Sequence, residues 1–228
     1  MKQLLSQIKI EVNKNLFLKD PESSDLGKRI VQNSILLIDE IGFEQFTFKK
    51  LGKEIGSNES SVYRYFENKH KLLLYLASWY WGWKEYQLVF STANISEPQV
   101  KLQKAVQVLT RQVEKDSFVS HVDEVTLNKV VVNEFSKSYL TKEVEKENKE
   151  GFFAVYNRLV LRLKDLIQEV DPDYQYPSSL ASTILEGSLH QHFLKEHFSA
   201  LTECNAKVSP SEYFVHMVNN ILTPKKNG

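Results

Sequence analysis

The segment GFEQFTFKKLGKEIGSNESSVYRYF, residues 42–66, decides the fold of this 228-residue chain. Thr47 can cap a short helix, and Gly56 stands where the chain must leave that helix, which favours a residue with positive φ. Asn58 can cap a second helix over residues 59–66, whose apolar side chains recur at helical spacing. The segment therefore predicts two short helices joined by a tight turn, which is the shape of a helix-turn-helix that reads DNA.

The second helix is expected to face DNA with its polar side. Val62 and Phe66 lie four residues apart and mark the buried face. Small polar side chains at the N-terminal end of such a helix fit the major groove. The residues expected to contact double-stranded DNA are Thr47, Asn58, Glu59, Ser60, Ser61, Tyr63, Arg64 and Lys69. Of these, the phosphate contacts are assigned to Thr47, Tyr63 and Lys69. The base contacts are assigned to Glu59, Ser60, Ser61 and Arg64.

Over residues 25–74 the sequence resembles the TetR family of bacterial transcriptional repressors. The matching features are an apolar helix that ends in Gly42-Phe43, a helix start at Thr47, a glycine turn, the Tyr63-x-x-Phe66 pair and Asn68-Lys69 at the start of a fourth helix. The resemblance implies a three-helix DNA-binding head, and a helical body that binds a small-molecule effector and forms a homodimer. The sequence departs from the family at two positions: Glu59 stands where a basic or small residue is more usual, and Tyr65 replaces a frequent histidine.

The predicted head has almost no net charge, which keeps two other interpretations open. Residues 25–71 contain eight Lys and Arg against seven Asp and Glu, so few DNA phosphates should be neutralised. One alternative is a helical small-molecule-binding protein whose head does not read DNA in a sequence-specific way. The other is a plain helical hairpin inside an all-α protein.

The composition is that of a soluble globular protein, because 42% of the residues are hydrophobic and 25% are charged. The formal net charge is zero, so any DNA contact must be local. One cysteine, Cys204, cannot form an internal disulfide, and no signal peptide opens the chain, so we expect a cytoplasmic protein. The longest apolar stretch, residues 72–83, is too short to span a membrane.

Eight glycines, six prolines and apolar residues at three- and four-residue spacing predict an all-α fold. The expected helices are residues 25–41, 47–55, 59–66, 69–91, 97–116, 121–138, 140–170, 177–197 and 210–222. Pro98, Pro177 and Pro210 each lie just inside a helix start, where proline is tolerated. The expected organisation is an N-terminal arm (1–20), a helix-turn-helix domain (21–68) and a ligand-binding and dimerisation domain (69–228).

The N-terminal arm has a pattern that fits either a helix or a strand, so periodicity does not decide its structure. We expect it to pack on the head. The alternative is that it reaches DNA, for which Lys9, Lys14 and Lys19 would be its charges.

The long fourth helix carries large rings along one stripe. Such a stripe is usually core, but it can also form the wall of an apolar ligand pocket between helices. The candidate ligand-binding residues are Trp79, Trp83, Tyr86, Phe135, Phe152, Tyr156 and Leu189.

The last two helices are the predicted dimer interface, which the resemblance also implies. Their apolar faces are larger than one flank of a monomer needs, and two such helices from each subunit can form a four-helix bundle. The candidate interface residues are Leu185, Leu189, Phe193, Phe214, Met217 and Ile221, with Gly187 and Ser188 allowing close approach across the axis.

No catalytic, metal or cofactor site is expected. Glu186 and His190, and likewise His192 and Glu196, could share a helix face, but the two pairs point in different directions. Cys204 has no base beside it in the sequence, and no phosphate-binding glycine loop is present. An enzyme is therefore not expected.

Overall fold

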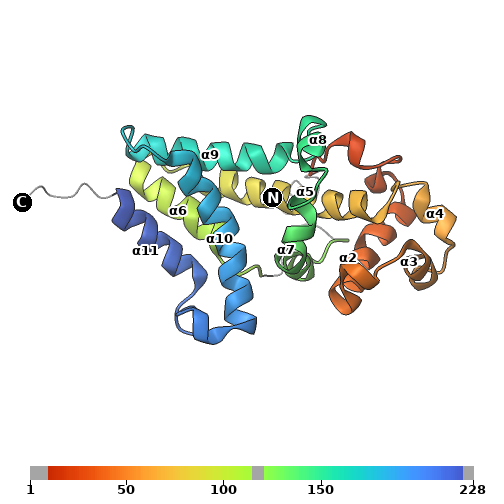
Figure 1. The fold of residues 1–228 in the computed structure, drawn as a ribbon. Coiled ribbons are helices and arrows are strands. Elements are labelled where there is room, and N and C mark those ends of the chain that lie inside the picture. The colour runs from red at the N-terminus through yellow and green to blue at the C-terminus, as the bar shows by residue number, and fades with distance from the viewer. Residues whose placement is uncertain (1–9, 115–120, 223–228) are drawn as a thin grey trace, which may run out of the picture. The chain divides into compact units, whose positions relative to one another are not determined.

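The computed structural model describes residues 10–114 and 121–222, and in these residues it contains ten α-helices, three short 3-10 helices and no strand (Figure 1). The all-α fold class is confirmed. No helix among the described residues is both long and apolar enough to cross a membrane. The chain forms two compact units, which are described separately. Unit 1 comprises Met1–Gly82 and Val113–Val155, and unit 2 comprises Trp83–Gln112 and Tyr156–Gly228.

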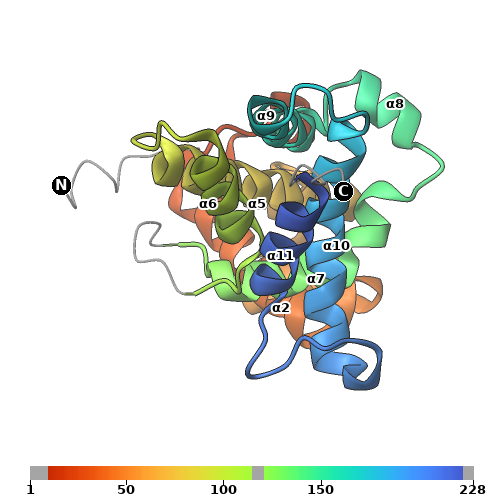
Figure 2. The same cartoon turned by 90° about the vertical axis from the view of Figure 1, so that its left-hand side faces the viewer.

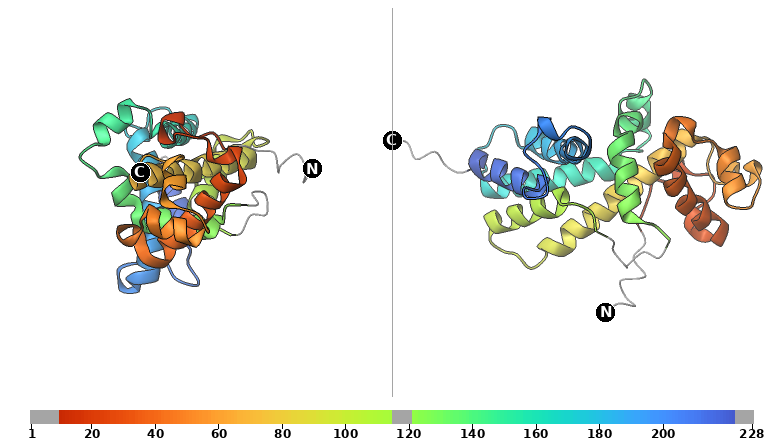
Figure 3. Two further views of the ribbon diagram at one scale, coloured as in Figure 1. Left: turned by 90° about the vertical axis from the view of Figure 1, so that its right-hand side faces the viewer. Right: turned by 90° about the horizontal axis from the view of Figure 1, so that it is seen from below.

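Unit 1 contains the predicted helix-turn-helix. Its elements are η1 (Lys14–Leu16), η2 (Pro21–Ser23), α2 (Asp25–Gln45), α3 (Phe48–Glu54), α4 (Glu59–Tyr63), the first part of α5 (Lys69–Thr92), α7 (Glu124–Tyr139) and α8 (Val144–Lys149). Helix α3 packs beside α4, and α7 packs against α2, as the orange and green ribbons of Figure 3 show. The centre of this unit is apolar and fully buried, with Ile30, Phe46, Leu51, Val62 and Phe66 among its side chains.

Side-chain caps explain where these helices begin. Ser24 accepts the Gly27 N–H at the start of α2, Thr47 accepts the Lys50 N–H at α3, and Asp123 accepts two N–H groups at α7. Each cap satisfies a donor that the first turn of a helix leaves without an intrahelical partner. The helix starts are therefore set locally by single polar residues.

Unit 2 contains the second part of α5, most of α9 (Ala154–Val170), and α6 (Pro98–Thr110), α10 (Pro177–His197), η3 (Ser199–Leu201) and α11 (Pro210–Leu222). Helix α11 packs along α6 and α10 (Figure 2). Pro98, Pro177 and Pro210 begin three of these helices, as predicted. A Cβ at Gly187 of α10 would lie 3.0 Å from Cζ of Phe214, so this glycine allows α10 and α11 of one chain to approach closely.

Two predicted helices differ most from the structure, while α4 ends at Tyr63, three residues before the predicted end at residue 66. The single helix expected over residues 140–170 is broken between α8 and α9, because Gly151 has φ 79°, a conformation that interrupts a helix. The helix expected over residues 97–116 ends at Thr110, where Arg111 is extended, and residues 115 and 116 lie outside the described residues.

Residues 10–20 of the arm pack on unit 1, as expected. Leu16 is fully buried, and the Leu18 N–H donates to the Tyr65 carbonyl at 2.7 Å. Asn13 Nδ2 donates to the Glu150 carbonyl at 3.0 Å, and Ile10 rests against Gly82 of α5. The earlier part of the arm, Lys9 included, lies outside the described residues.

The boundary of unit 1 differs from the predicted domain boundary at residue 68. Helices α7 and α8 and part of α5 belong to the same compact unit as the helix-turn-helix. The division into a DNA-binding and a ligand-binding domain concerns function, and it stays a prediction.

Candidate functional site

Two glycines shape the helix-turn-helix at residues 47–66. Gly56 has φ 62°, as the sequence predicted, and a larger side chain would be strained there. Gly52 lies where α3 and α4 approach, because a Cβ built on it would be 3.0 Å from the Glu59 backbone nitrogen. The Ser57 N–H donates to the Gly52 carbonyl at 2.8 Å and closes the turn. These contacts hold α4 at a fixed position on α3.

The exposed face of α3 and α4 carries most of the predicted DNA contacts. Thr47, Asn58, Ser60, Tyr63 and Arg64 are exposed. Tyr63 is 47% exposed, and its ring packs edge-on against Phe48 with centroids 4.9 Å apart. Glu59 is half-buried. This face can present donors and acceptors to a nucleic acid.

Ser61 does not face outward, which corrects the sequence prediction. Its side chain is buried, and its hydroxyl donates to Asn58 Oδ1 at 2.7 Å and accepts a hydrogen bond from Arg64 at 3.3 Å. A helix of five residues is too short for helical periodicity to separate its faces, so Ser61 was assigned to the wrong side. Ser61 therefore bonds to its neighbours Asn58 and Arg64, and a contact between Ser61 and DNA stays a prediction.

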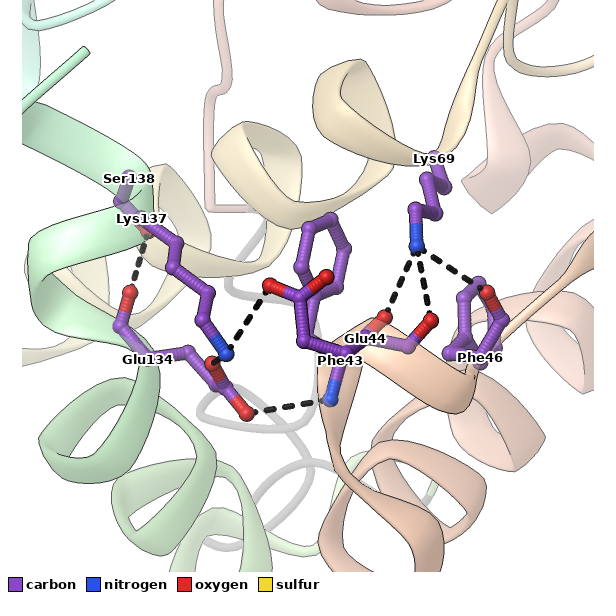
Figure 4. A network of polar contacts seen from close by, with 7 residues as sticks. All are labelled: Phe43, Glu44, Phe46, Lys69, Glu134, Lys137 and Ser138. Carbon is purple, nitrogen blue, oxygen red and sulfur yellow. Dashed lines mark hydrogen bonds and ion pairs between the residues drawn. The ribbon is translucent and has the colours of Figure 1, made fainter.

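Lys69 is the second correction, and Figure 4 shows its surroundings. Its ammonium donates to the backbone carbonyls of Phe43, Glu44 and Phe46 at 3.0, 3.2 and 3.3 Å, at the end of α2. The same ammonium lies 4.7 Å from the centre of the Phe43 ring. An ammonium has three N–H donors, so none remains for a DNA phosphate while these bonds are made.

A buried carboxylate joins α7 to the end of α2 in the same region. Glu134 Oε1 accepts the Phe43 N–H at 3.0 Å, just after Gly42 breaks α2 with φ 74° (Figure 4). Lys137 forms ion pairs with Glu134 at 2.7 Å and with Glu44 at 3.3 Å. The hydrogen bond from Glu134 raises the pKa of Lys137, so this ammonium stays charged.

Sequence reasoning missed this connection, because Glu134 and Lys137 three residues apart look like a solvated helix face. The available signal was that Glu134 shares the apolar stripe of Leu127, Val130 and Val131, all of which are buried. A buried carboxylate such as that of Glu134 needs a hydrogen-bond donor. The Phe43 N–H, which follows the break of α2 at Gly42, supplies one.

The predicted ligand-binding residues fall in both units. Trp79, Phe135 and Phe152 belong to unit 1, and Trp83, Tyr86, Tyr156 and Leu189 belong to unit 2. Trp79 and Trp83 are 3% exposed. Phe152 lies under the Lys71 ammonium at 4.3 Å, and the Tyr156 hydroxyl donates to Glu186 at 2.6 Å. Phe152 is also buried, whereas Tyr86, Phe135 and Tyr156 are half-buried, and the role of all these rings in ligand binding stays a prediction.

Two pockets open on the surface of unit 2, and none of the predicted ligand-binding residues lines either. One, of about 320 Å³, has apolar Leu88 and Leu166 beside charged Lys101, Arg162 and Glu169. The other, of about 510 Å³, lies between α6 and α11 and is lined mainly by polar side chains. Both lie within the volume range of small-molecule sites.

Unit 2 also buries charged groups of α5 that no sequence pattern marks. Glu85 accepts hydrogen bonds from Arg158 and Arg162 of α9 at 2.6–3.0 Å. Burial would raise the pKa of Glu85, but the hydrogen bonds and charges of the two arginines outweigh burial and lower it. Lys84 is fully buried and donates to the Leu109 carbonyl at 3.4 Å. Burial, with the nearby Arg111 charge, lowers the pKa of Lys84 to about 7.

The predicted dimer residues need a correction. Leu185, Leu189 and Phe214 are buried within one chain, so they add no surface for a second chain. The close approach expected at Gly187 is made with Phe214 of the same chain. Phe193 and Met217 are half-buried, and Ile221 is 40% exposed, so these three remain available.

The histidines of α10 form no metal site. His192 Nε2 donates to the Thr110 carbonyl at 2.9 Å, while His190 and His197 flank the ring of Phe193. Among the described residues no group of three or more His, Cys, Asp and Glu side chains could hold a metal ion.

A comparison with protein-family models matches one segment in the N-terminal part of the chain. Residues 30–76 match the family model described as bacterial regulatory proteins of the tetR family. No curated protein sequence matches the chain.

Several solved structures share the fold at low sequence identity. AibR in complex with isovaleryl coenzyme A and operator DNA has a TM-score of 0.58 and 15% identity, over 86% of this chain and 98% of that chain. The fatty acid degradation regulator FadR from Bacillus halodurans has a TM-score of 0.59 and 14% identity, over 87% and 95%. A protein described as superantigen PfiT also matches, with a TM-score of 0.59 and 17% identity, over 91% and 100%. At these identities the likeness concerns the fold alone.

The family match covers α3, α4 and the start of α5. The structural similarity to AibR covers 86% of the chain. Residues 30–76 therefore match the tetR family of bacterial regulatory proteins, and most of the chain shares the fold of solved structures such as AibR.

Proposed function

We propose that this protein is a homodimeric, ligand-responsive transcriptional repressor that binds a pseudo-palindromic DNA operator in the bacterial cytoplasm. The observation that carries the proposal is the exposed polar face of α3 and α4, in the segment that matches the DNA-binding domain of the family. In this proposal residues 21–68 read DNA, and residues 69–228 bind the effector and dimerise. The chain acts by binding and not by catalysis.

The DNA contacts are divided by chemistry. The Tyr63 hydroxyl and the Thr47 end of α3 bind phosphates, while Asn58, Ser60 and Arg64 face the base edges, with Glu59 beside them. Arg64 is exposed, and one of its amino groups is held by Ser61, so its guanidinium is partly oriented before DNA binds. Ser61 bonds to Asn58 and Arg64 and so orients this face, whereas Lys69 binds carbonyls at the end of α2.

The repressor responds to its ligand by a population shift. A ligand that prefers the state in which the two DNA-reading heads are wrongly spaced weakens DNA binding, by no more than its differential affinity for the two states. The AibR structure is a complex with both isovaleryl coenzyme A and operator DNA, which supports a ligand-responsive role for a protein of this fold. For this chain the candidate effector-binding residues include the aromatic side chains Trp79 and Trp83.

The dimer uses the exposed faces of α10 and α11. On α10 this face carries His190, Phe193 and His197, and on α11 it carries Met217 and Ile221. A two-fold contact between such faces would pair two chains, and the repressor proposal requires the two α4 helices of the pair to lie about one DNA turn apart on the operator. A glutamate at Ile221 should split the dimer without unfolding the chain, whereas a charge at the buried Leu189 would unfold it.

The second candidate function is a helical small-molecule-binding protein without sequence-specific DNA binding. The near-neutral head favours it, since eight basic residues against seven acidic ones supply little attraction for phosphates. The fold of PfiT, described as a superantigen, also shows that this architecture is not confined to proteins described as regulators.

A mobility-shift titration against DNA from upstream of the protein's own gene separates the two functions. The wild type should shift this DNA in the presence of excess unrelated competitor, and Tyr63→Phe and Arg64→Ala should weaken the shift. Lys129→Met is a matched control, because Lys129 is exposed on α7 and makes no hydrogen bond or ion pair with a described residue. Equal competition by unrelated DNA would contradict the repressor and favour the second function.

A further inference from the structure

A polar network at the start of α4 fixes the orientation of the Asn58 amide. Asn58 Oδ1 accepts hydrogen bonds from the Ser61 backbone N–H at 2.9 Å, from the Ser61 hydroxyl at 2.7 Å and from the Ser60 hydroxyl at 2.9 Å. A backbone N–H can only donate, so the atom that receives it must be the amide oxygen and not the amide nitrogen. The two ends of this side chain are therefore distinguishable.

The amide nitrogen faces the other way. Asn58 is exposed, and its Nδ2 group donates to no residue that the structure describes. The oxygen has no spare lone pair, because three donors already share it. Asn58 therefore presents two N–H donors and no acceptor on the DNA-reading face.

The donor and acceptor roles in this network also oppose a 180° rotation of the Asn58 side-chain amide. Arg64 can only donate, so its hydrogen bond to Ser61 at 3.3 Å makes the Ser61 oxygen an acceptor there. The Ser61 hydroxyl proton is then directed to Asn58. Turning the amide over would place an N–H group against two hydroxyls and a backbone N–H, and would lose the cap of α4.

We propose that Asn58 is a specificity-determining residue that reads a base edge made only of acceptors. In the major groove guanine presents two acceptors, O6 and N7, whereas cytosine presents an amino donor. The paired contact that Asn commonly makes with adenine needs the amide oxygen as acceptor, and here that oxygen is occupied. This inference rests on the proposed DNA-binding function and adds that guanine is preferred and cytosine rejected at one position of each half-site.

The test is selection from a randomised DNA library by three proteins: the wild type, Asn58→Asp and Asn58→Ser. Aspartate keeps the oxygen that caps α4 and replaces the outward N–H groups by an acceptor, so folding should be preserved. Its preference should switch from guanine to cytosine at one base pair per half-site, by about tenfold in the binding ratio. Serine keeps a cap but has no group that reaches the base, so preference there should vanish.

Lys129→Met is the control, because Lys129 is exposed on α7, outside the DNA-reading face, and makes no hydrogen bond or ion pair with a described residue. The guanine preference should therefore survive in this variant. The thermal unfolding midpoint of each variant confirms that it is folded. Overall affinity of Asn58→Asp is expected to fall, because a second carboxylate beside Glu59 repels phosphates, so the ratio between bases carries the test.

Two results would overturn the inference while the proposed function stands. One is wild-type selection of adenine at the position that responds to Asn58. The other is a uniform loss of affinity in Asn58→Asp with unchanged base preference, which would make Asn58 a phosphate contact. If the wild type enriched no sequence at all, the DNA-binding function itself would be wrong.

Discussion

A substitution of Lys69 can distinguish a role in DNA binding from a role in the stability of the fold. Its ammonium donates to three carbonyls at the end of α2, and two of these bonds are partly buried. Lys69→Met keeps the aliphatic stem and removes the charge. A hydrogen bond to a charged group contributes about 1.5–3 kcal/mol net, and a cation near a helix C-terminus contributes about 0.3–1 kcal/mol more. Water can replace the exposed bond to the Glu44 carbonyl and can partly replace the two partly buried bonds. We therefore count those two as one such bond and expect a total loss of about 2–4 kcal/mol.

Urea denaturation measures this loss, with Lys129→Met as the control that should change the free energy of unfolding by less than about 0.5 kcal/mol. DNA titrations at several salt concentrations supply the second readout. If Lys69 is structural, the folded variant keeps the wild-type salt dependence. A variant with unchanged urea stability, and a salt slope lower by about one, would refute the structural role and restore the phosphate contact.

Three further changes test other parts of the structure. Glu134→Leu leaves the Phe43 N–H buried without an acceptor and should cost about 1–3 kcal/mol in urea denaturation, while Glu134→Gln keeps an acceptor and should cost about half as much or less. Gly82→Ala should fail to give the stabilisation of about 0.5–1 kcal/mol usual in a helix, because its Cβ would lie 2.6 Å from Ile10, and the Ile10→Ala background should restore that gain. Wild-type stability should rise between about pH 7 and pH 10, because the lowered pKa of Lys84 means that the unfolded chain binds more protons there. Lys84→Met should remove this slope and stabilise the fold at pH 7 by roughly 2–5 kcal/mol, and a slope that persists in the variant would assign it to another group.

The sequence predicts the head well because its elements are set by single residues. Thr47 and Asn58 cap their helices, and Gly56 has the positive φ that the turn requires, so each boundary follows from local chemistry. The prolines at 98, 177 and 210 act in the same way for three helices of unit 2. The break at Gly151 was missed, because a lone glycine after a run of charged residues is compatible with a continuous helix.

The site was less predictable wherever side chains bond to groups distant in sequence. Lys69 contacts carbonyls more than twenty residues earlier, and Glu134 accepts an N–H about ninety residues away, so neither partner follows from periodicity. The burial of some predicted dimer residues within one chain has a related reason. Apolar residues such as Leu189 and Phe214 can face a helix of the same chain as readily as a second chain, and a pattern on one helix does not distinguish the two.

The central claim is that this fold reads a two-fold symmetric DNA sequence, and selection from a library of randomised duplexes tests it most directly. We predict that the bound fraction, sequenced after several rounds, contains two inverted half-sites whose centres lie about ten base pairs, or a multiple of that, apart. The selected duplex should bind two copies of the chain. A folded protein that returns the input distribution of sequences, or binds every duplex equally with a dependence on salt alone, would contradict the claim.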